Sequence, residues 1–550
     1  MWCPCCGDFL RGLRYGANPK SHSDPKGELT RRVFVASGVA VGANAVFPAK
    51  GFGQSPAPAI SADEVVLANG RVIDPETKLD AVRNVKIKSG QIAVVSEAPL
   101  DGQMVLDANG LVVAPGFIDW HVHGQNILAD RVLAFDGVTT SLELEMGMLP
   151  LGRWYDIQAA TGRVLNYGAA SSWAFARLAT LEDIPLSAEP RAEWAFAAFG
   201  RKKWPNNVAT PDQVNRIVKM IEQGLKEGGI GIGVVPGYAP GAGYMELLAV
   251  QTLAAKYEVP TYWHVRSEAE YDPLSAEQAY GEAISCAACT GSWLHICHLN
   301  STSFHDIERA AQMVQSAQRH GVKITVEAYP YGAASTAIGA AALAPENLPR
   351  TGMTYQSIEF EGRRLNEQTY HELRLKNPGA IVVVHFLELP RDQALLDVSV
   401  LFDGAIIASD GMPWFSTKTG DHVDDHAWPP PADAFSHPRS AGTHARFIGQ
   451  YVRERKLISL LDAIAKTAYL PAKLMEETVP QLKKKGRIQV GMDADIVVFD
   501  PLTVQDRATY ERPNQVSVGM KNVLVNGKFV IHDGVLDTKA FPGRAIRRVT

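Results

Sequence analysis

Two histidines, His121 and His123, come directly after an apolar run and a Pro-Gly pair in the segment VVAPGFIDWHVHG, residues 112–124. Such an apolar run predicts a strand. Side chains two residues apart in a strand point to the same side. Two imidazoles at the end of one strand can therefore bind the same metal ion.

Three more residues with metal-binding side chains stand at the ends of other predicted strands. These are His264 after PTYW, His298 after WLHIC and Asp410 after IIAS. In a parallel barrel the carboxyl ends of the strands meet at one face, where the loops build the active site. Four imidazoles and a carboxylate at that face predict a hydrolytic metal centre. We expect one or two divalent ions, with zinc favoured.

The middle of the chain, residues 113–484, has the pattern needed to position these side chains. Strands are predicted at 117–123, 138–145, 167–175, 230–235, 261–264, 293–298, 324–329 and 405–410. Helical spacing of apolar residues lies between them, for example at Val214, Ile217, Val218, Ile221 and Leu225. Eight strand–helix alternations predict an α/β fold, a TIM-like (β/α)8 barrel. The excess length is largest at about 336–401, where we expect an inserted lobe.

The two flanks of the barrel segment are β-rich. Residues 60–112 and 485–550 contain short alternating runs broken by turn signals such as Asn69-Gly70 and Asn526-Gly527. We expect both flanks to combine into one small composite β-sandwich.

The first 59 residues have the composition of a targeting segment. Residues 30–35, TRRVFV, resemble the twin-arginine export motif, and an apolar stretch at 33–47 and a Pro/Ala/Gly-rich stretch at 48–59 follow. The sequence thus predicts export to the periplasm or beyond through the twin-arginine machinery. The apolar stretch is too short for stable membrane insertion. A net charge of −5 gives no basic field for nucleic acid.

The motifs together resemble the amidohydrolase superfamily and, within it, the N-acyl-D-amino-acid deacylases. The segments that carry the resemblance are PGFIDWHVH (115–123), GVTT (137–140), HVRSE (264–268), AYPY (328–331), SDGMP (409–413), HPR (437–439) and GMDADIVVFD (491–500). The resemblance covers nearly the whole chain after the leader. It implies a metal-dependent hydrolase that cleaves the C–N bond of a linear amide, an N-acyl (D-)amino acid. A cyclic amidase or a dipeptidase stays open, as does, more remotely, a non-enzymatic binding protein on this fold.

The sequence departs from the deacylase pattern at three places. The deacylases carry a metal-binding cysteine shortly after Gly-Val-Thr-Thr, and here that position is Met146. We expect the neighbouring Glu145 to bridge the metal ions instead, with Glu143 as the fallback, because a carboxylate can bridge two cations as a thiolate can. The family's His-His-Lys is HLN here, so Asn300 replaces the lysine implied to contact the substrate carboxylate. Lastly, Gly124-Gln125 replaces the usual two aspartates.

Four further residues are predicted to contact the substrate. Arg439 corresponds to the family's carboxylate-binding arginine, and a planar guanidinium suits bidentate carboxylate binding. Tyr329 and Ser335 match family positions that can hydrogen-bond the substrate, and Tyr238 lies on a loop after a predicted strand.

Asp410 is the predicted catalytic residue. A metal ion brings the pKa of a bound water toward neutrality. Asp410 would then take the proton of that water and return it to the leaving nitrogen.

Overall fold

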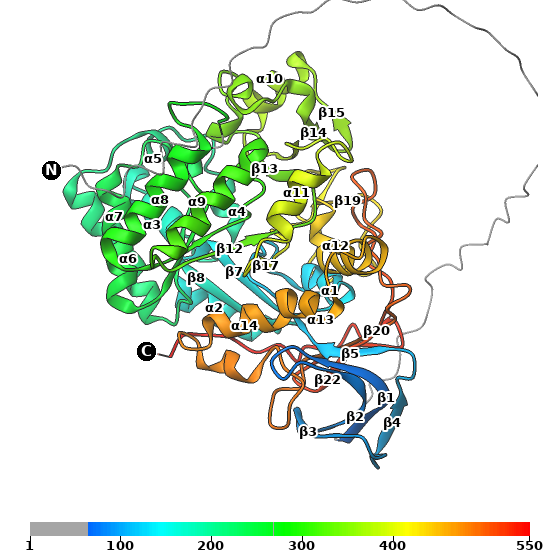
Figure 1. Ribbon diagram of the computed structural model, residues 1–550. Helices are drawn as coiled ribbons and strands as arrows, with labels where there is room; N and C mark the ends of the chain where they lie inside the picture. Colours follow the sequence, from blue (N-terminus) through cyan, green and yellow to red (C-terminus); the bar gives the residue numbers. More distant parts are fainter. Residues whose placement is uncertain (1–63, 268, 550) are drawn as a thin grey trace, which may run out of the picture. The chain divides into compact units, whose positions relative to one another are not determined.

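The computed structural model describes residues 64–267 and 269–549. Its centre is an eight-stranded parallel sheet in the order β17-β12-β11-β10-β9-β8-β7-β6 (Figure 1). A bridge between Val122 and Gly411 joins the segments that directly follow the two outer strands of that order, so that the barrel is nearly closed. The strands are β6 (Phe117–Asp119), β7 (Val138–Met148), β8 (Asn166–Ser172), β9 (Ile232–Val234), β10 (Pro260–Trp263), β11 (Trp293–Ile296), β12 (Ile324–Ala328) and β17 (Ile406–Ile407). The predicted (β/α)8 barrel is confirmed.

Seven of the eight barrel strands end before the predicted residue, and three of them do so by three residues or more. Strand β6 stops at Asp119, because the Asp119 carboxylate accepts the backbone N–H of His121 and draws the chain out of the ladder. Strand β8 ends at Ser172, whose hydroxyl caps the helix that begins at Trp173. Strand β17 has only two residues. The metal-binding candidates therefore lie in the irregular backbone just beyond the strands.

Helices follow most of the strands. They are α1 (Ile127–Phe135), α2 (Leu151–Thr161), α3 (Trp173–Glu182), α4 (Ala192–Phe196), α5 (Lys203–Asn206), α6 (Pro211–Lys226), α7 (Tyr244–Tyr257), α8 (Ala276–Thr290), α9 (Ile307–Arg319) and α11 (Gln393–Val400). Helix α6 shows why these segments fold: Thr210 and Gln213 form a capping box at its start. The apolar face of α6 buries Ile217, Ile221 and Leu225 against the barrel. No helix in residues 64–267 and 269–549 is long and apolar enough to cross a membrane.

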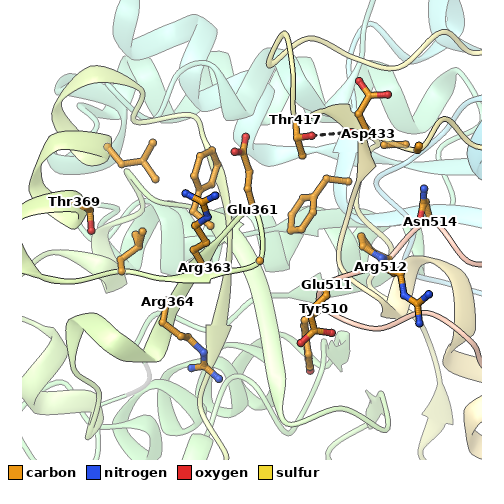
Figure 2. A pocket seen from close by; sticks show the side chains of 18 of the residues that line it. Glu361, Arg363, Arg364, Thr369, Thr417, Asp433, Tyr510, Glu511, Arg512 and Asn514 are labelled. Atoms are coloured by element: carbon orange, nitrogen blue, oxygen red, sulfur yellow. Dashed lines mark hydrogen bonds between the residues drawn. The ribbon is translucent and has the colours of Figure 1, made fainter.

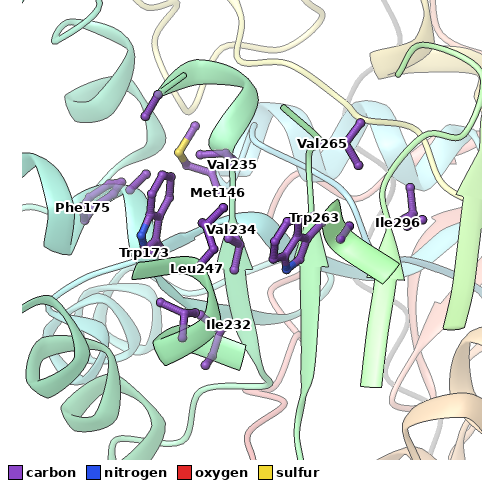
Figure 3. Close-up of a cluster of buried hydrophobic side chains, with 14 of the residues drawn as sticks. Met146, Trp173, Phe175, Ile232, Val234, Val235, Leu247, Trp263, Val265 and Ile296 are labelled. Carbon is purple, nitrogen blue, oxygen red and sulfur yellow. The ribbon is translucent and has the colours of Figure 1, made fainter. Parts of the chain in front are cut away.

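The main core lies between the barrel strands and these helices. Figure 3 shows part of this cluster, to which Trp173 and Phe175 of α3 belong together with Val234 and Val235. Met146 of β7 belongs to the same apolar cluster. Its side chain therefore contributes to packing.

Strands from both flanks of the barrel form one nine-stranded mixed sheet, in the order β23-β22-β21-β20-β5-β1-β2-β3 with β4 beside β1. They are β1 (Glu64–Asp74), β2 (Leu79–Lys88), β3 (Gln91–Ser96), β4 (Met104–Asp107), β5 (Val112–Pro115), β20 (Ile496–Phe499), β21 (Met520–Val525), β22 (Lys528–His532) and β23 (Val535–Leu536). The antiparallel pairing of β5 with β20 joins the two flanks. The small β-domain is thus assembled from both ends of the folded chain.

An insertion between β12 and α11 forms a lobe. Its antiparallel sheet has the order β13-β16-β14-β15, from β13 (Ala333–Ala337), β14 (Ile358–Phe360), β15 (Arg363–Arg364) and β16 (Ile381–His385), and it carries α10 (Glu367–Lys376). The lobe begins slightly before the expected residue 336. Helix α11 packs on α9 and β12, so it belongs to the barrel although it falls within the expected range.

The remaining elements are short. Strands β18 (Phe415–Ser416) and β19 (Ala434–Phe435) form a hairpin. Helices α12 (Arg439–Arg446), α13 (Leu460–Ile464) and α14 (Leu470–Met475) are linked by the π-helical segments η8 (Phe447–Glu454) and η9 (Ala465–Tyr469). The 3-10 turns are η3 (Pro236–Tyr238), η4 (Phe304–Asp306), η5 (Ala341–Leu343), η6 (Leu348–Thr351), η7 (Tyr355–Ser357) and η10 (Pro480–Lys484).

Candidate metal centre

His121 and His123 are both buried, and each is oriented by a carboxylate behind it. The Nδ1 atom of His121 lies 2.5 Å from Oε1 of Glu327. The Nδ1 atom of His123 lies 2.8 Å from Oε2 of Glu143. Their Nε2 atoms lie 3.3 Å apart. A carboxylate behind a histidine fixes the ring and its tautomer, an arrangement common at metal sites. Both Nε2 atoms are thus directed to one point.

His264 and His298 approach the same point from β10 and β11. The Nδ1 atom of His264 lies 3.0 Å from Oε1 of Glu145, and Nε2 of His298 lies 2.8 Å from that oxygen. Gly237 allows the His264 ring to lie close to the backbone of η3, because a Cβ at position 237 would be 2.5 Å from that ring. The buried Nδ1 of His298 makes no hydrogen bond.

Glu145 lies among all four imidazoles. Its second oxygen, Oε2, is 3.3 Å from Nε2 of His121 and 3.4 Å from Nε2 of His123. The pairing of β7 with β8 is irregular between Glu143 and Met148, which turns this part of β7 out of register. Gly233 of β9 leaves room for the displaced Glu145 carbonyl, since a Cβ there would lie 2.1 Å from its oxygen. Glu145 therefore faces the histidines while Met146 faces the core.

Asp410 completes the cluster from the end of β17. Its Oδ1 lies 3.4 Å from Nε2 of both His121 and His123. Its Oδ2 forms an ion pair with Nη2 of Arg439, at a distance of 2.7 Å. The backbone φ of Asp410 is +52°, in the left-handed region that non-glycine residues rarely adopt. Such backbone strain is frequent at functional sites.

The electrostatics of the cluster favour a bound cation. Burial lowers the pKa of His121, but Asp410, Glu145 and Glu327 outweigh it and raise that pKa well above its usual value. Burial raises the pKa of Glu145, but His121, His264 and His298 outweigh it and lower that pKa well below its usual value. The charged form of these buried carboxylates is thus stabilised by positive charge nearby.

The donor atoms fit a metal ion. One set of nitrogen and oxygen atoms within 4.8 Å of one another comes from His121, His123 and Glu145, and another comes from Glu145, His264 and His298. Imidazole nitrogen and carboxylate oxygen are ordinary zinc ligands. The two sets share Glu145, so the geometry also fits two neighbouring ions with a carboxylate between them.

A narrow cavity of about 50 Å3 opens beside the cluster. Tyr238, His264, His298, Ser335 and Asp410 line it. The Tyr238 ring lies 4.5 Å from the His264 ring and its hydroxyl accepts a hydrogen bond from Thr336. The Ser335 hydroxyl is buried without a hydrogen-bond partner. Two of the predicted substrate contacts, Tyr238 and Ser335, therefore face the cavity.

The other two predicted substrate contacts, Tyr329 and Arg439, do not line it. Arg439 is fully buried, with its guanidinium 4.7 Å above the Tyr329 ring. Its Nε donates to the Asp410 carbonyl and its Nη2 pairs with the Asp410 carboxylate, while Nη1 has no partner. Asn300 donates to the Tyr329 carbonyl and so supports that segment. The two N–H groups of the Arg439 Nη1 thus have no partner, but Arg439 is not among the residues that line the cavity.

Two functional residues were missed from the sequence. Glu327 orients His121 and also lies 3.2 Å from His295. Asp119 accepts the backbone N–H groups of His121 and Ser409, which ties the ends of β6 and β17 together. A signal for Glu327 existed, because it is an acidic residue inside an otherwise apolar strand.

The protein has two further cavities of note. One of about 190 Å3 reaches His123 from the side of α2 and α4. A larger one of about 760 Å3 lies between the lobe and a C-terminal segment, with Arg363 and Arg364 on one side and Tyr510 and Arg512 on the other (Figure 2). The described residues that line the larger cavity include none of the metal-centre candidates.

Comparison with known proteins identifies the class to which this fold and site belong. The model of the amidohydrolase family matches residues 104–531. The chain belongs to that family. It is 28% identical over 536 residues to an N-acyl-D-glutamate deacylase from Alcaligenes xylosoxydans xylosoxydans, a match that covers 88% of this chain and 96% of the relative. A D-aminoacylase from the same organism is 26% identical, with 88% and 97% covered.

A solved structure has the same fold. The N-acyl-D-glutamate deacylase from Bordetella bronchiseptica, complexed with zinc and a phosphonate inhibitor, superposes with a TM-score of 0.69 at 23% identity. The match covers 88% of this chain and all of that one.

Proposed function

We propose that this protein is a metal-dependent hydrolase that cleaves the amide C–N bond of an N-acyl amino acid, with the D-series favoured. The observation that carries the proposal is the convergence of four imidazoles, Glu145 and Asp410 beside one cavity at the strand ends. Membership of the amidohydrolase family and the deacylase relatives support the reaction class.

Zinc is the favoured metal. The donor set suits zinc, and the zinc complex of the Bordetella deacylase supports that choice. His121, His123 and Asp410 would hold one ion, and His264 and His298 a second, with Glu145 between them. When bound, the metal supplies Lewis acidity to the substrate carbonyl and acidity to a bound water.

The two oxygens of Asp410 would have different roles. Oδ2 is paired with Arg439, whereas Oδ1 faces the histidine nitrogens. Oδ1 is therefore the atom that takes the proton from the attacking water and returns it to the leaving nitrogen. The Tyr238 hydroxyl, on the cavity wall beside His264, would donate to the developing oxyanion.

The test is hydrolysis by purified, zinc-loaded protein. N-acetyl-D- and N-acetyl-L-amino acids, a cyclic amide and a dipeptide are compared under one set of conditions. We expect release of free amino acid from the acetylated substrates and loss of activity with a chelator. Preferred hydrolysis of the cyclic amide or the dipeptide would replace the proposed substrate class, and chelator-resistant activity would refute metal dependence.

Export through the twin-arginine machinery is a separate proposal. Its motif, Arg31-Arg32, lies outside the described residues, so the support comes from the sequence alone. Arg31→Lys combined with Arg32→Lys should retain the precursor in the cytoplasm, because a receptor recognises the arginine pair. Cell fractionation checks this, and unchanged delivery of the double variant would refute the signal.

A further inference from the structure

The wall of the cavity opposite the metal centre comes from the inserted lobe. Six apolar side chains of this wall are contributed by lobe residues: Ala334, Ala340, Ala342, Leu343, Met353 and Val384. Leu343, Met353 and Val384 also belong to a buried apolar cluster that joins lobe residues to residues of the barrel. We call these six residues the lobe wall.

Positive charge is scarce around this cavity. Among the described residues that line it there is no lysine or arginine. The nearest guanidinium, Arg439, is already paired with Asp410, and only its Nη1 lacks a partner. Asn300 is neutral and directs its amide to the Tyr329 carbonyl. The buried donors without a partner near this cavity include the Arg439 Nη1, the Tyr329 hydroxyl and the Ser335 hydroxyl, and of these three Ser335 lines the cavity.

The lobe wall also offers no counterion for a further negative charge. Among the described residues that line the cavity, the acidic one is Asp410, at the metal centre. A second carboxylate on the substrate would lose its water against an apolar wall without a cation to pair with, which is costly.

We propose that the lobe wall selects a substrate with a single carboxylate, an N-acyl amino acid whose side chain is uncharged and apolar, and excludes N-acyl aspartate and glutamate. This inference rests on the proposed function and specifies its substrate. The side chain lies against the lobe wall, and the α-carboxylate is bound at the Ser335 hydroxyl.

The free space of about 50 Å3 is smaller than a substrate side chain. Met353, unbranched and with several rotatable bonds, is suited to move aside. The lobe wall thus adapts to apolar side chains of different shapes by repacking, without supplying a charge.

The experiment separates binding from turnover. The Asp410→Asn enzyme, loaded with zinc, is titrated calorimetrically with N-acetylleucine and N-acetylglutamate, each as D and L enantiomers. We expect the better enantiomer of N-acetylleucine to bind at least about 100-fold more tightly than either N-acetylglutamate. Equal or tighter binding of N-acetylglutamate, or no binding of either compound, would overturn the inference. If the native enzyme fails to hydrolyse the compound that binds, the proposed function fails instead.

A matched pair of variants tests the lobe wall itself. Ala342 and Ala341 are neighbours in η5 and both are half-buried, but only Ala342 lines the cavity. Ala342→Arg adds a cation to the wall and should reduce the preference for N-acetylleucine to within about tenfold. Ala341→Arg should leave the preference unchanged. Equal effects of the two variants would contradict the assignment. If Ala342→Arg is unstable, the ratio of the affinities for N-acetylleucine and N-acetylglutamate, measured with the unaltered lobe wall, decides the test.

Discussion

The metal centre and the lobe wall face each other across one cavity, yet they are built in opposite ways. At the metal centre, His121 and His123 each have a carboxylate partner, and Asp410 is paired with Arg439. At the lobe wall, the six side chains are apolar. The metal centre stands at the ends of barrel strands, whereas the lobe wall comes from an insertion. Chemistry is thus placed on the rigid scaffold and selectivity on the added segment.

This difference predicts different consequences of substitution. A change at the metal centre removes charge-assisted contacts or ligands and should act on turnover or metal affinity. A change at the lobe wall alters shape and should act on the ratio between substrates. The predictions below follow this comparison from the largest expected effect to the smallest.

Asp410→Asn should have the largest effect. An amide cannot take and return a proton, so kcat should fall by about 100- to 10,000-fold. Asparagine tolerates the left-handed backbone at this position, where φ is +52°, so the fold should persist. Steady-state kinetics, metal analysis and circular dichroism provide the measurements.

Asp403→Asn is the matched control, because Asp403 is an exposed aspartate in the same segment. It should retain full activity. If Asp410→Asn retains kcat close to that of the native enzyme, the proton is moved by another group and Asp410 has only a structural role.

Glu145→Ala should lower metal affinity by more than the roughly 10- to 100-fold that loss of an outer-shell partner costs. The reason is that Glu145 contacts all four imidazoles. Its removal would leave the bound metal cations without the carboxylate that lies between them. Glu143→Ala should have the smaller effect, because the Glu143 carboxylate pairs with His123, and the contact of Glu143 with His121 is a backbone bridge that alanine keeps. Metal per chain after dialysis against buffered zinc checks the order. Reversal of the order would make Glu143 the ligand, and no change in either would exclude this strand from the metal centre.

The sequence was most informative where the type of secondary structure determines the place of a side chain. Strand ends in a parallel barrel must meet, so His264, His298 and Asp410 could be brought together from their places after apolar runs. The choice of Glu145 over Glu143 as the central carboxylate stays a prediction, but the geometry now favours it. The sequence could not show the irregularity in β7, which depends on the space left by Gly233.

The lobe wall was invisible for a physical reason. Ala340, Ala342 and Leu343 lie in short turns, where neither helical nor strand periodicity marks a buried face. Arg439 shows another limit of the sequence. Its residue type suggested a substrate contact, but the sequence did not reveal that its Nε and Nη2 atoms both bind Asp410.

Glu327→Gln tests the support behind the metal centre. It keeps the side-chain size but removes the charge that faces Nδ1 of His121 and Nε2 of His295. We expect a loss of metal affinity of about 10- to 100-fold with kcat at saturating zinc reduced less. Glu359→Gln is a suitable control, since Glu359 is also a buried glutamate beside a histidine, His385, but lies in the lobe. If both variants bind zinc as the native chain does, Glu327 contributes packing alone.

Ser335→Ala should have the smallest effect, because it removes a single neutral donor on the lobe side of the cavity. The Ser335 hydroxyl is buried and unpaired, so it is available to the substrate carboxylate. Its loss should raise KM about 5- to 10-fold, equivalent to about 1 to 1.4 kcal/mol, and leave kcat unchanged. Ser357→Ala, at a lobe serine that does not line the cavity, should change neither constant. A fall in kcat at constant KM for Ser335→Ala would instead place this hydroxyl in the chemical step, and the division between a catalytic face and a selective face would no longer hold.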